Sequence, residues 1–260
     1  MDQLVLVRGG VFVKHVGRRQ IVADATRAVF FNKHVGYRVS HPADGGDRCT
    51  TIACATEAWR DLLAAHDPRA ADRADRILPT SDRAMSARAV LGHQQLRRAL
   101  RADPLDTLRA EEMTLAVVDR VLSDVAGGSN DNDQPRRRST RQAQRDLVER
   151  TKLVLATQAG AGRSLASLAR DVCSSPFHLS RIFRREVGVP IHQYVMRLRL
   201  SLAVERLLDS PDSLSEIALA HGFSSHSHFT TAFRQAFGVA PSAVRSLLSA
   251  GQFRPGWHSS

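Results

Sequence analysis

Cysteine is scarce in this chain of 260 residues, which holds three cysteines and no Cys-x-x-Cys pair. An odd number of widely spaced cysteines (Cys49, Cys54 and Cys173) argues against a disulfide framework and favours a reducing compartment. Long apolar runs are also missing, since none approaches the roughly 18 residues of a membrane span. Charged Asp2 and Arg8 accompany the short apolar run at the N-terminus, which is not the pattern of a signal peptide. We therefore expect a cytoplasmic protein with no membrane partner.

Common enzyme motifs are absent too. The chain has no phosphate-binding glycine loop, no paired nucleophile and base, and no compact set of metal ligands. Its N-terminal histidines, cysteines and aspartates are irregularly spaced, and the segment HPADGGD at residues 41–47 is typical of a turn. If a metal ion were bound, its ligands would come from His34, His41 and Cys49. We expect no metal, no other cofactor and no enzymatic activity.

Positive charge is in excess, with 37 Lys and Arg against 26 Asp and Glu, which gives a net charge of +11. Residues 143–260 carry most of it, with 14 basic and 8 acidic residues, whereas residues 1–130 hold 19 and 16. A basic excess of this size suggests a polyanionic partner. Its position in the chain directs attention to the C-terminal half.

The N-terminal half changes character along its length. Residues 3–56 contain short alternating apolar runs, among them QLVLV and RAVFF, separated by turn signals, and they predict a small β-sandwich or barrel. Residues 81–126 have a helical pattern that Pro104 divides in two. The second helix has an apolar stripe, which either packs on the strands or contacts a second copy of the chain: Met113, Val117, Val118 and Val121.

A polar segment, GGSNDNDQPRRRSTR, occupies residues 127–141 and has the composition of a flexible linker that ends in a basic patch. After it every periodic segment is helical. We therefore expect an α+β protein with these parts: a β-rich sensor region (1–80), a helical pair (81–126), a linker (127–142), an all-helical domain (143–250) and a tail (251–260).

The all-helical domain contains one pattern twice. FRREVGV at residues 183–189 returns as FRQAFGV at residues 233–239, within the longer units 164–190 and 213–241. Each unit predicts a short helix, a turn, a serine that caps a second helix, and a glycine with a nearby proline that ends it. This is the plan of a helix-turn-helix unit. A plain helical bundle can imitate one such unit, but two copies with matched caps and stops argue against it.

The second helix of each unit has an apolar and a polar face. The apolar faces carry Leu179, Ile182 and Phe183 in the first copy, and Phe229, Ala232, Phe233 and Ala236 in the second. The polar faces carry the candidate DNA-binding residues, which are Phe177, Ser180, Arg181 and Arg184 in the first copy, and His226, Ser227, Thr230, Thr231 and Arg234 in the second. Arg181 suits guanine, Phe177 suits a thymine methyl group, and Arg184 and Arg234 suit phosphates.

Residues 190–209 predict the helix that joins the two copies. Its apolar stripe consists of Ile191, Tyr194, Val195, Leu198 and Leu202. A helix of about 20 residues is about 30 Å long, close to the roughly 34 Å of one turn of B-DNA. The two second helices can therefore enter successive major grooves on one face of a duplex.

The all-helical domain resembles the AraC/XylS family of bacterial transcription regulators over residues 145–248. The resemblance is strongest in SPFHLSRIFRREVGVPIHQYVMRLRL and IALAHGFSSHSHFTTAFRQAFGVAPSAVR. It implies a nucleoid-associated regulator that binds double-stranded DNA, contacts RNA polymerase and acts as an activator. It also implies base contacts by Phe177, Ser180 and Arg181 in the first copy, and by His226, Ser227 and Thr231 in the second.

The same resemblance implies a cupin-like barrel and dimerising helices in the N-terminal half, hence a small-molecule effector and a homodimer. The β-rich segment is short, so we expect an incomplete barrel, and the His-x-His pair of cupins is absent. Two alternatives stay open. One is a cupin-type metal-dependent enzyme with a helical accessory domain, and the other is an architectural DNA-binding protein whose binding depends little on sequence.

Overall fold

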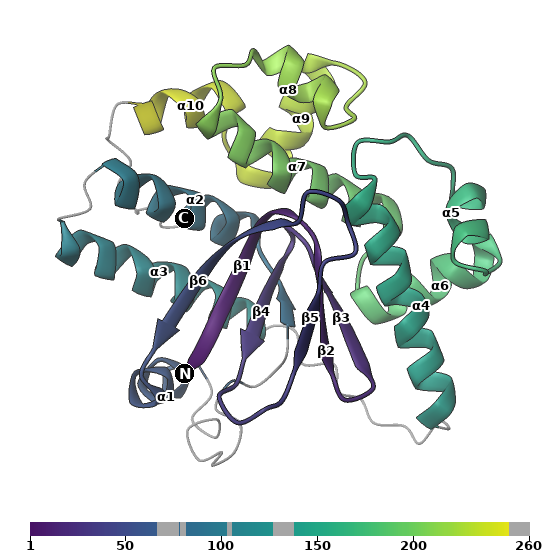
Figure 1. The fold of residues 1–260 in the computed structure, drawn as a ribbon. Helices are drawn as coiled ribbons and strands as arrows, with labels where there is room; N and C mark the ends of the chain where they lie inside the picture. Colours follow the sequence, from purple (N-terminus) through teal and green to yellow (C-terminus); the bar gives the residue numbers. More distant parts are fainter. Residues whose placement is uncertain (67–77, 79–81, 103–105, 127–137, 250–260) are drawn as a thin grey trace.

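The computed structural model describes residues 1–66, 78, 82–102, 106–126 and 138–249, and Figure 1 shows how they are arranged. The strands are β1 (Asp2–Gly10), β2 (Phe12–Val16), β3 (Arg19–Ala23), β4 (Arg27–Phe31), β5 (Arg38–Ser40), β6 (Asp47–Cys54) and β7 (Asp82–Ala84). The helices are α1 (Thr56–Ala64), α2 (Ala87–Ala102), α3 (Thr107–Ala126), α4 (Arg138–Thr157), α5 (Leu165–Asp171), α6 (Pro176–Val187), α7 (Ile191–Asp209), α8 (Leu214–Ala220), α9 (His226–Phe237) and α10 (Pro241–Ser249).

The strands form two antiparallel sheets that pack against each other. One has the order β6-β1-β4-β7 and the other β3-β2-β5. Because side chains alternate along a strand, Val5 on β1 packs with Phe12 of the second sheet. Its neighbours Leu4 and Leu6 point to the opposite side and join a core made with the helices. The predicted α+β class is confirmed, whereas the likeness to a cupin barrel stays a prediction.

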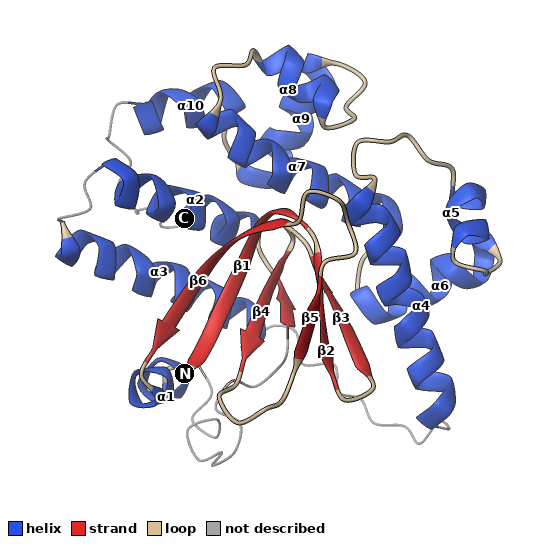
Figure 2. Cartoon of the chain, viewed as in Figure 1, coloured by secondary structure: helices blue, strands red, loops and turns tan. Residues whose placement is uncertain are grey.

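Helices α2 and α3 cover the four-stranded sheet (Figure 2). The predicted stripe of α3 faces inward, with Val117, Val118 and Val121 fully buried and Met113 half-buried. Of the two predicted roles for this stripe, the structure therefore shows packing on the strands. A dimer formed through α3 would have to use its outward face, where Leu108 and Leu115 are exposed.

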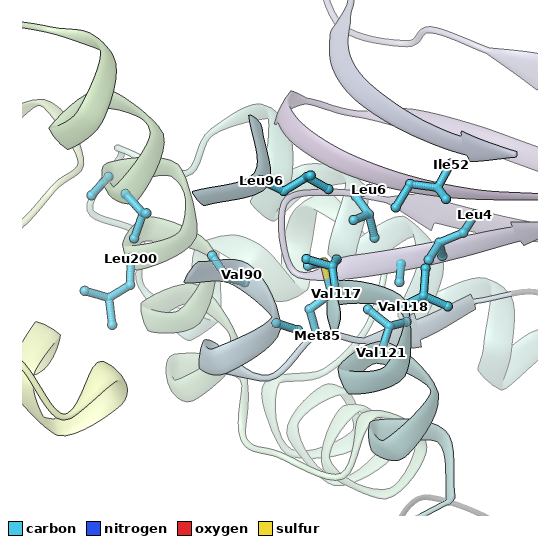
Figure 3. Packing of buried hydrophobic residues seen from close by; sticks show 14 of the residues in the cluster. Leu4, Leu6, Ile52, Met85, Val90, Leu96, Val117, Val118, Val121 and Leu200 are labelled. Atoms are coloured by element: carbon cyan, nitrogen blue, oxygen red, sulfur yellow. The ribbon is translucent and has the colours of Figure 1, made fainter. Parts of the chain in front are cut away.

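The N-terminal half and the second helix-turn-helix unit share one hydrophobic core (Figure 3). It runs from the β1–β4–β6 face through α2 and α3 to α7, α8 and α9, and includes Phe30, Val90, Leu200 and Phe233. The first unit has a separate core, formed by α4, α5, α6 and the start of α7. The sequence did not predict that the sheet and the second helix-turn-helix unit would share a hydrophobic core.

Helix α7 is buried on more than the predicted stripe. Tyr194 and Leu198 of that stripe are buried, whereas Ile191, Val195 and Leu202 are only half-buried. Additional buried residues, Leu200, Val204 and Leu207, follow an i, i+4, i+7 spacing and belong to the core shared with the N-terminal half. The helix thus serves two hydrophobic cores, one for each face.

The boundary between the halves differs from the prediction at one point. Helix α4 begins at Arg138, so residues 138–142, expected in the linker, belong to this helix. The remaining predicted linker, residues 127–137, and the predicted tail, residues 251–260, lie outside the described residues, as does Pro104. In the described ranges no helix is long and apolar enough to cross a membrane.

His93 on α2 is a titratable group enclosed near the shared core. Its side chain is buried, and its Nε2 atom has no hydrogen-bond partner among the described residues. Burial, together with the nearby cations of Arg97 and Arg8, lowers the pKa of His93 from 6.5 to about 3. The folded protein therefore holds a neutral imidazole at neutral pH.

We expect the free energy of unfolding to fall as the pH drops from about 6.5 towards 4, by up to about 1.4 kcal/mol per pH unit from His93. The unfolded chain takes up the proton first, because the folded pKa lies below the unfolded value. Denaturant titrations at several pH values measure this slope. His93→Gln should flatten it, and parallel pH profiles of the two proteins would contradict the assignment.

Candidate DNA-binding surface

The first helix-turn-helix unit consists of α5 and α6. The hydroxyl of Ser164 accepts a hydrogen bond from the backbone N–H of Ser167 at 3.1 Å and caps α5. The hydroxyl of Ser175 accepts from the N–H of His178 at 3.3 Å and caps α6, which has proline in its first turn. Gly188, with φ of 84°, ends α6 in the left-handed conformation. The predicted serine cap and glycine stop of α6 are therefore present, and α5 has a serine cap that was not predicted.

The second unit, α8 and α9, repeats this arrangement. Ser213 and Glu216 form a capping box at the start of α8, with hydrogen bonds of 3.2 and 2.7 Å. The hydroxyl of Ser225 caps α9 by accepting from the N–H of His228 at 3.1 Å, and Gly238 ends the helix with φ of 76°. Two units of the same local chemistry thus flank α7.

On α6 the four predicted residues form one exposed face. Phe177 has 79% of its surface exposed although it is aromatic. Ser180, Arg181 and Arg184 are exposed beside it, and together with Arg185 they line an open hollow. Arg181 and Arg184 have no ion pair within the described part of the chain, so their guanidinium groups are available to an anion.

Arg185 was not among the predicted residues, although it lies next to Arg184. Its guanidinium donates to the carboxylate of Glu186 at 2.7 and 3.0 Å and also to the side chain of Gln144. This charge is already partly neutralised. The position of Arg185 next to Arg184 was the one signal in the sequence that Arg185 belongs to this surface.

On α9 the predicted residues also share one side. His226, Ser227, Thr231 and Arg234 are exposed, and Thr230 is half-buried. The Thr230 hydroxyl lies 3.4 Å from Nε2 of His226. Arg234, like Arg181, has no ion pair among the described residues. The polar face is therefore present on both second helices.

The apolar face of α9 is narrower than predicted. Phe229 and Phe233 are fully buried, and Ala232 is half-buried, but Ala236 is exposed. Ala236 lies in the last turn, where Phe237 turns inward instead and its ring centroid is 4.4 Å from that of Phe233. The prediction for Ala236 was wrong because near a helix end the neighbouring elements, more than periodicity, decide which side is covered.

The turn before α9 brings two parts of the backbone close together. Gly222 has φ of +74°, and a Cβ atom on it would lie 2.6 Å from the carbonyl oxygen of Gly160. Gly188 also has a positive φ, but a Cβ atom there would have open space. The two glycines therefore separate the cost of backbone conformation from the cost of a clash.

Gly188→Ala should cost about 1 kcal/mol of stability, since only the left-handed backbone conformation is penalised. Gly222→Ala should cost about 2 kcal/mol, because the same penalty is joined by the displacement of Gly160. Denaturant unfolding of both variants measures the difference. Equal losses would mean that the Gly160–Gly222 approach is looser than described.

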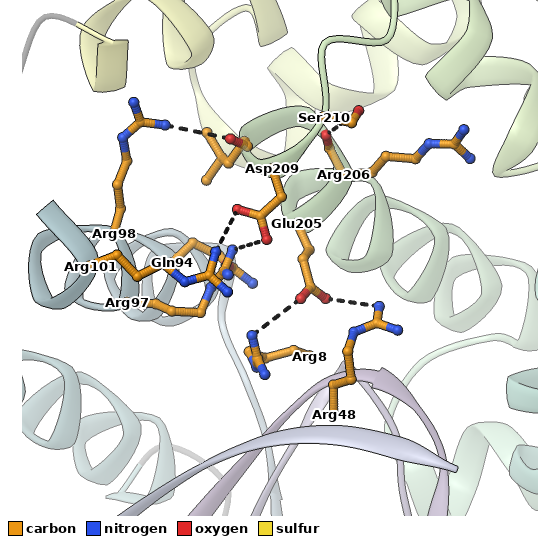
Figure 4. Close-up of polar contacts among 11 residues, drawn as sticks. Arg8, Arg48, Gln94, Arg97, Arg98, Arg101, Glu205, Arg206, Asp209 and Ser210 are labelled. Atoms are coloured by element: carbon orange, nitrogen blue, oxygen red, sulfur yellow. Dashed lines mark hydrogen bonds and ion pairs between the residues drawn. The ribbon is translucent and has the colours of Figure 1, made fainter. Parts of the chain in front are cut away.

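The N-terminal half contacts the DNA-binding half through ion pairs that the sequence did not predict (Figure 4). Glu205 on α7 is approached by Arg8 and Arg48, each at 3.4 Å. Asp209 pairs with Arg97 at 2.7 Å and with Arg101 at 3.4 Å. These contacts hold the second half of α7 against β1, β6 and α2.

A second set of polar contacts joins the N-terminal half to the first unit. The hydroxyl of Tyr194 on α7 donates to the buried carboxylate of Asp24. Burial, followed by the charge of Asp24, raises the pKa of Tyr194 well above its ordinary value, so the hydroxyl keeps its proton. The carboxylate of Glu149 on α4 accepts from the N–H of Val22 at 2.7 Å. Both units are thus held by the same N-terminal half.

The three metal candidates do not form one cluster. His41 and the thiol of Cys49 both contact the carboxylate of Asp47, each at 2.9 Å, whereas His34 is exposed and shares no hydrogen bond with them. Burial, helped by Asp47, raises the pKa of Cys49, which favours the protonated thiol over a metal-binding thiolate. In the part of the chain that the structure describes, no three His, Cys, Asp or Glu side chains are grouped as a metal ion would require.

Comparison with known proteins concerns the same helical region. A family described as "Helix-turn-helix domain" matches residues 168–246. HTH-type transcriptional regulator ArgR of Pseudomonas aeruginosa is 36% identical over 103 residues, which are 39% of this chain and 31% of that protein. HTH-type transcriptional activator RhaS of Pectobacterium carotovorum is 45% identical over 67 residues, which are 26% of this chain and 24% of that protein. The match thus spans a third or less of these two relatives.

A shorter relative is matched over most of its length. Probable transcription factor PqrA of Proteus vulgaris is 34% identical over 88 residues, which are 34% of this chain and 72% of that protein. Its matched length is close to that of the two units with α7 between them. By its two capped helix-turn-helix units and by these relatives, the chain belongs to the AraC/XylS family of transcription regulators.

Proposed function

We propose that this protein is a sequence-specific DNA-binding regulator of transcription that inserts α6 and α9 into successive major grooves. The observation that carries the proposal is the pair of exposed polar faces on two identically capped helices, whose arginines Arg181, Arg184 and Arg234 have no internal counter-charge in the described ranges. Helix α7 has 19 residues and is about 28 Å long, which suits one turn of DNA.

Within this proposal the two faces read bases and hold the backbone. Arg181 bonds to a guanine and Phe177 packs on a thymine methyl group, because both project from the first turns of α6. Ser180, His226, Ser227, Thr230 and Thr231 make the remaining base contacts. Arg184 and Arg234, one turn further along, bind phosphates, where a charge is needed but base identity is not.

The N-terminal half, residues 1–126, serves in this proposal as the sensor of a small effector and as the dimerising part. Its ion pairs with Glu205 and Asp209 and its contact with Tyr194 supply a physical route to both DNA-binding units. Activation through RNA polymerase is the mode we propose, since the relative RhaS is named an activator. Binding to chromosomal DNA places the protein in the cytoplasm, at the nucleoid.

We propose no enzymatic activity for the chain. A cupin-type metal-dependent enzyme would need several ligands around one ion, and the contacts of Asp47 with His41 and Cys49 supply a hydrogen-bonded turn instead. The architectural alternative keeps DNA binding but removes sequence preference, so the same experiment decides between it and a regulator.

Selection of bound sequences from random duplex DNA, with the purified full-length protein, tests the proposed function. We expect two short preferred blocks about 10 base pairs apart, centre to centre. One block would mean that a single unit reads bases and the other holds only the backbone. Binding without enrichment would support the architectural alternative, and absence of binding under all salt conditions would reject the proposed function.

A further inference from the structure

One side chain connects the second helix-turn-helix unit with the segment that leads into the first. Arg199 lies on α7, midway between them, and its guanidinium donates three hydrogen bonds to backbone carbonyls. Nε donates to Ala159 at 2.8 Å and Nη2 to Ala161 at 3.1 Å, both in the connection between α4 and α5. Nη1 donates to Gly222 at 2.8 Å, in the turn between α8 and α9.

One bridged segment leads into the first unit, and the other is the turn within the second unit. Ala161 comes three residues before Ser164, the residue that caps α5 of the first unit. Gly222 comes three residues before Ser225, the residue that caps the second helix of the second unit, α9. A displacement of either segment relative to α7 would therefore move the helix that follows it, α5 in the first unit or α9 in the second.

Direct backbone contact supports the same bridge. The position of a Cβ atom on Gly222 is 2.6 Å from the Gly160 oxygen and 2.9 Å from the Arg199 guanidinium, so no larger residue fits between the two segments. Elsewhere the units belong to different hydrophobic cores, the first with α4 and the second with the N-terminal half. Their relative position then depends on α7, on this bridge and on the contacts with the N-terminal half.

Arginine is suited to this task and lysine is not. A guanidinium holds its five N–H donors in one rigid plane, so three carbonyls around it are fixed relative to one another. A lysine ammonium keeps the charge but has a flexible stem and no planar fork. The conservative variant therefore separates the geometry of the bridge from its charge.

We propose that Arg199 is a positioning residue that fixes the separation and rotation of α6 relative to α9, and so restricts the protein to DNA sites with one spacing between their two blocks. This inference rests on the proposed function. A shift of one base pair moves a block by about 3.4 Å and rotates it by about 36°, since a turn has about 10 base pairs. A rigid pair of helices cannot follow that shift, whereas a flexible pair can.

Fluorescence anisotropy with three duplexes tests the inference. Each duplex carries the selected site, and its spacer is one base pair shorter, unchanged, or one base pair longer. Wild-type protein should bind the two altered duplexes at least about 10-fold more weakly than the unchanged one, as expected when the contacts of one unit are lost. For Arg199→Lys and Arg199→Gln, the loss of affinity on the two altered duplexes should shrink to about 3-fold or less. Their affinity for a duplex with a single block should equal that of wild type.

Arg197→Gln is the matched control, because Arg197 lies on the same helix, is exposed and has no hydrogen bond or ion pair among the described residues. It removes the same charge and should keep the wild-type spacing preference. Arg199 variants that retain the full penalty, or that lose affinity equally for single-block and two-block duplexes, would overturn the positioning role. Because a folding defect in Arg199→Gln would also reduce single-block binding, Arg199→Lys with wild-type single-block affinity gives the decisive comparison.

The two proposals fail in different ways. If wild-type protein binds its selected site but tolerates all three spacings equally, the inference about Arg199 is wrong and the proposed function stands. If wild-type protein shows no sequence preference at all, the proposed function fails and the inference fails with it.

Discussion

Phe233→Ala should lower the free energy of unfolding by about 3–5 kcal/mol, and the loss should extend to the N-terminal sheet. Phe233 is fully buried and packs edge to face on Phe229, with ring centroids 5.6 Å apart. Its core also contains Phe30 of β4 and Val90 of α2. A cavity at Phe233 therefore removes contacts from a core that both halves of the chain share.

Fluorescence of Trp59, which is buried in α1, reports unfolding of the N-terminal half. A Trp257→Phe background removes the second tryptophan of the sequence. In that background we expect Phe233→Ala to move the Trp59 transition to a lower denaturant concentration, together with the loss of helical circular dichroism. An unmoved Trp59 transition would mean that the two halves unfold independently and that the shared core contributes little.

Phe177→Ala is the matched control for this experiment. The same aromatic side chain is removed, but Phe177 is 79% exposed, so stability should change by less than about 0.5 kcal/mol. Affinity for the selected DNA site should fall instead, because the residue lies on the proposed reading face of α6. The two phenylalanines thus separate loss of fold from loss of recognition.

Arg181→Ala should weaken binding to the selected site by about 1–3 kcal/mol and relax the preference at one base pair. The guanidinium of Arg181 is exposed on the polar face of α6 and has no internal ion pair among the described residues, so nothing in the described protein competes with a guanine for it. Anisotropy titrations against the selected site and against single-base variants measure both effects. An equal loss on every duplex would identify Arg181 as a phosphate contact.

Arg184→Ala provides the contrast from the same helix. Because we assign Arg184 to a phosphate, its removal should weaken binding to all duplexes alike and reduce the slope of log K against log salt by about 1. Affinities measured from low to moderate salt give this slope directly. A slope equal to that of wild type would reject the phosphate assignment.

Much of the DNA-binding half follows from the sequence alone. A serine was predicted to cap, and a glycine to end, the second helix of each unit, and the structure places these residues at Ser175 and Gly188 of α6 and at Ser225 and Gly238 of α9. These features are predictable because a cap or a stop depends on hydrogen bonds and backbone angles within a few residues. The exposed face of α6 follows from the 3.6-residue period for the same reason.

Contacts between distant segments were decided by the tertiary structure. Leu200, Val204 and Leu207 repeat at helical spacing, and this second stripe on α7 is a signal in the sequence, but nothing local shows that the stripe packs with an N-terminal helix, α2, from a distant part of the chain. The ion pairs of Glu205 and Asp209, and the exposure of Ala236, depend likewise on which elements pack nearby.

The sequence by itself therefore determined two helix-turn-helix units, their polar faces and the helix that joins them, because each rests on local periodicity and capping. Only the tertiary structure decided how those units are held, through the shared core, the contact between Asp24 and Tyr194, and the three carbonyls around Arg199. The physical reason is that such contacts join residues far apart in the chain, and their pairing is set by packing and burial of the whole fold rather than by any neighbouring residues.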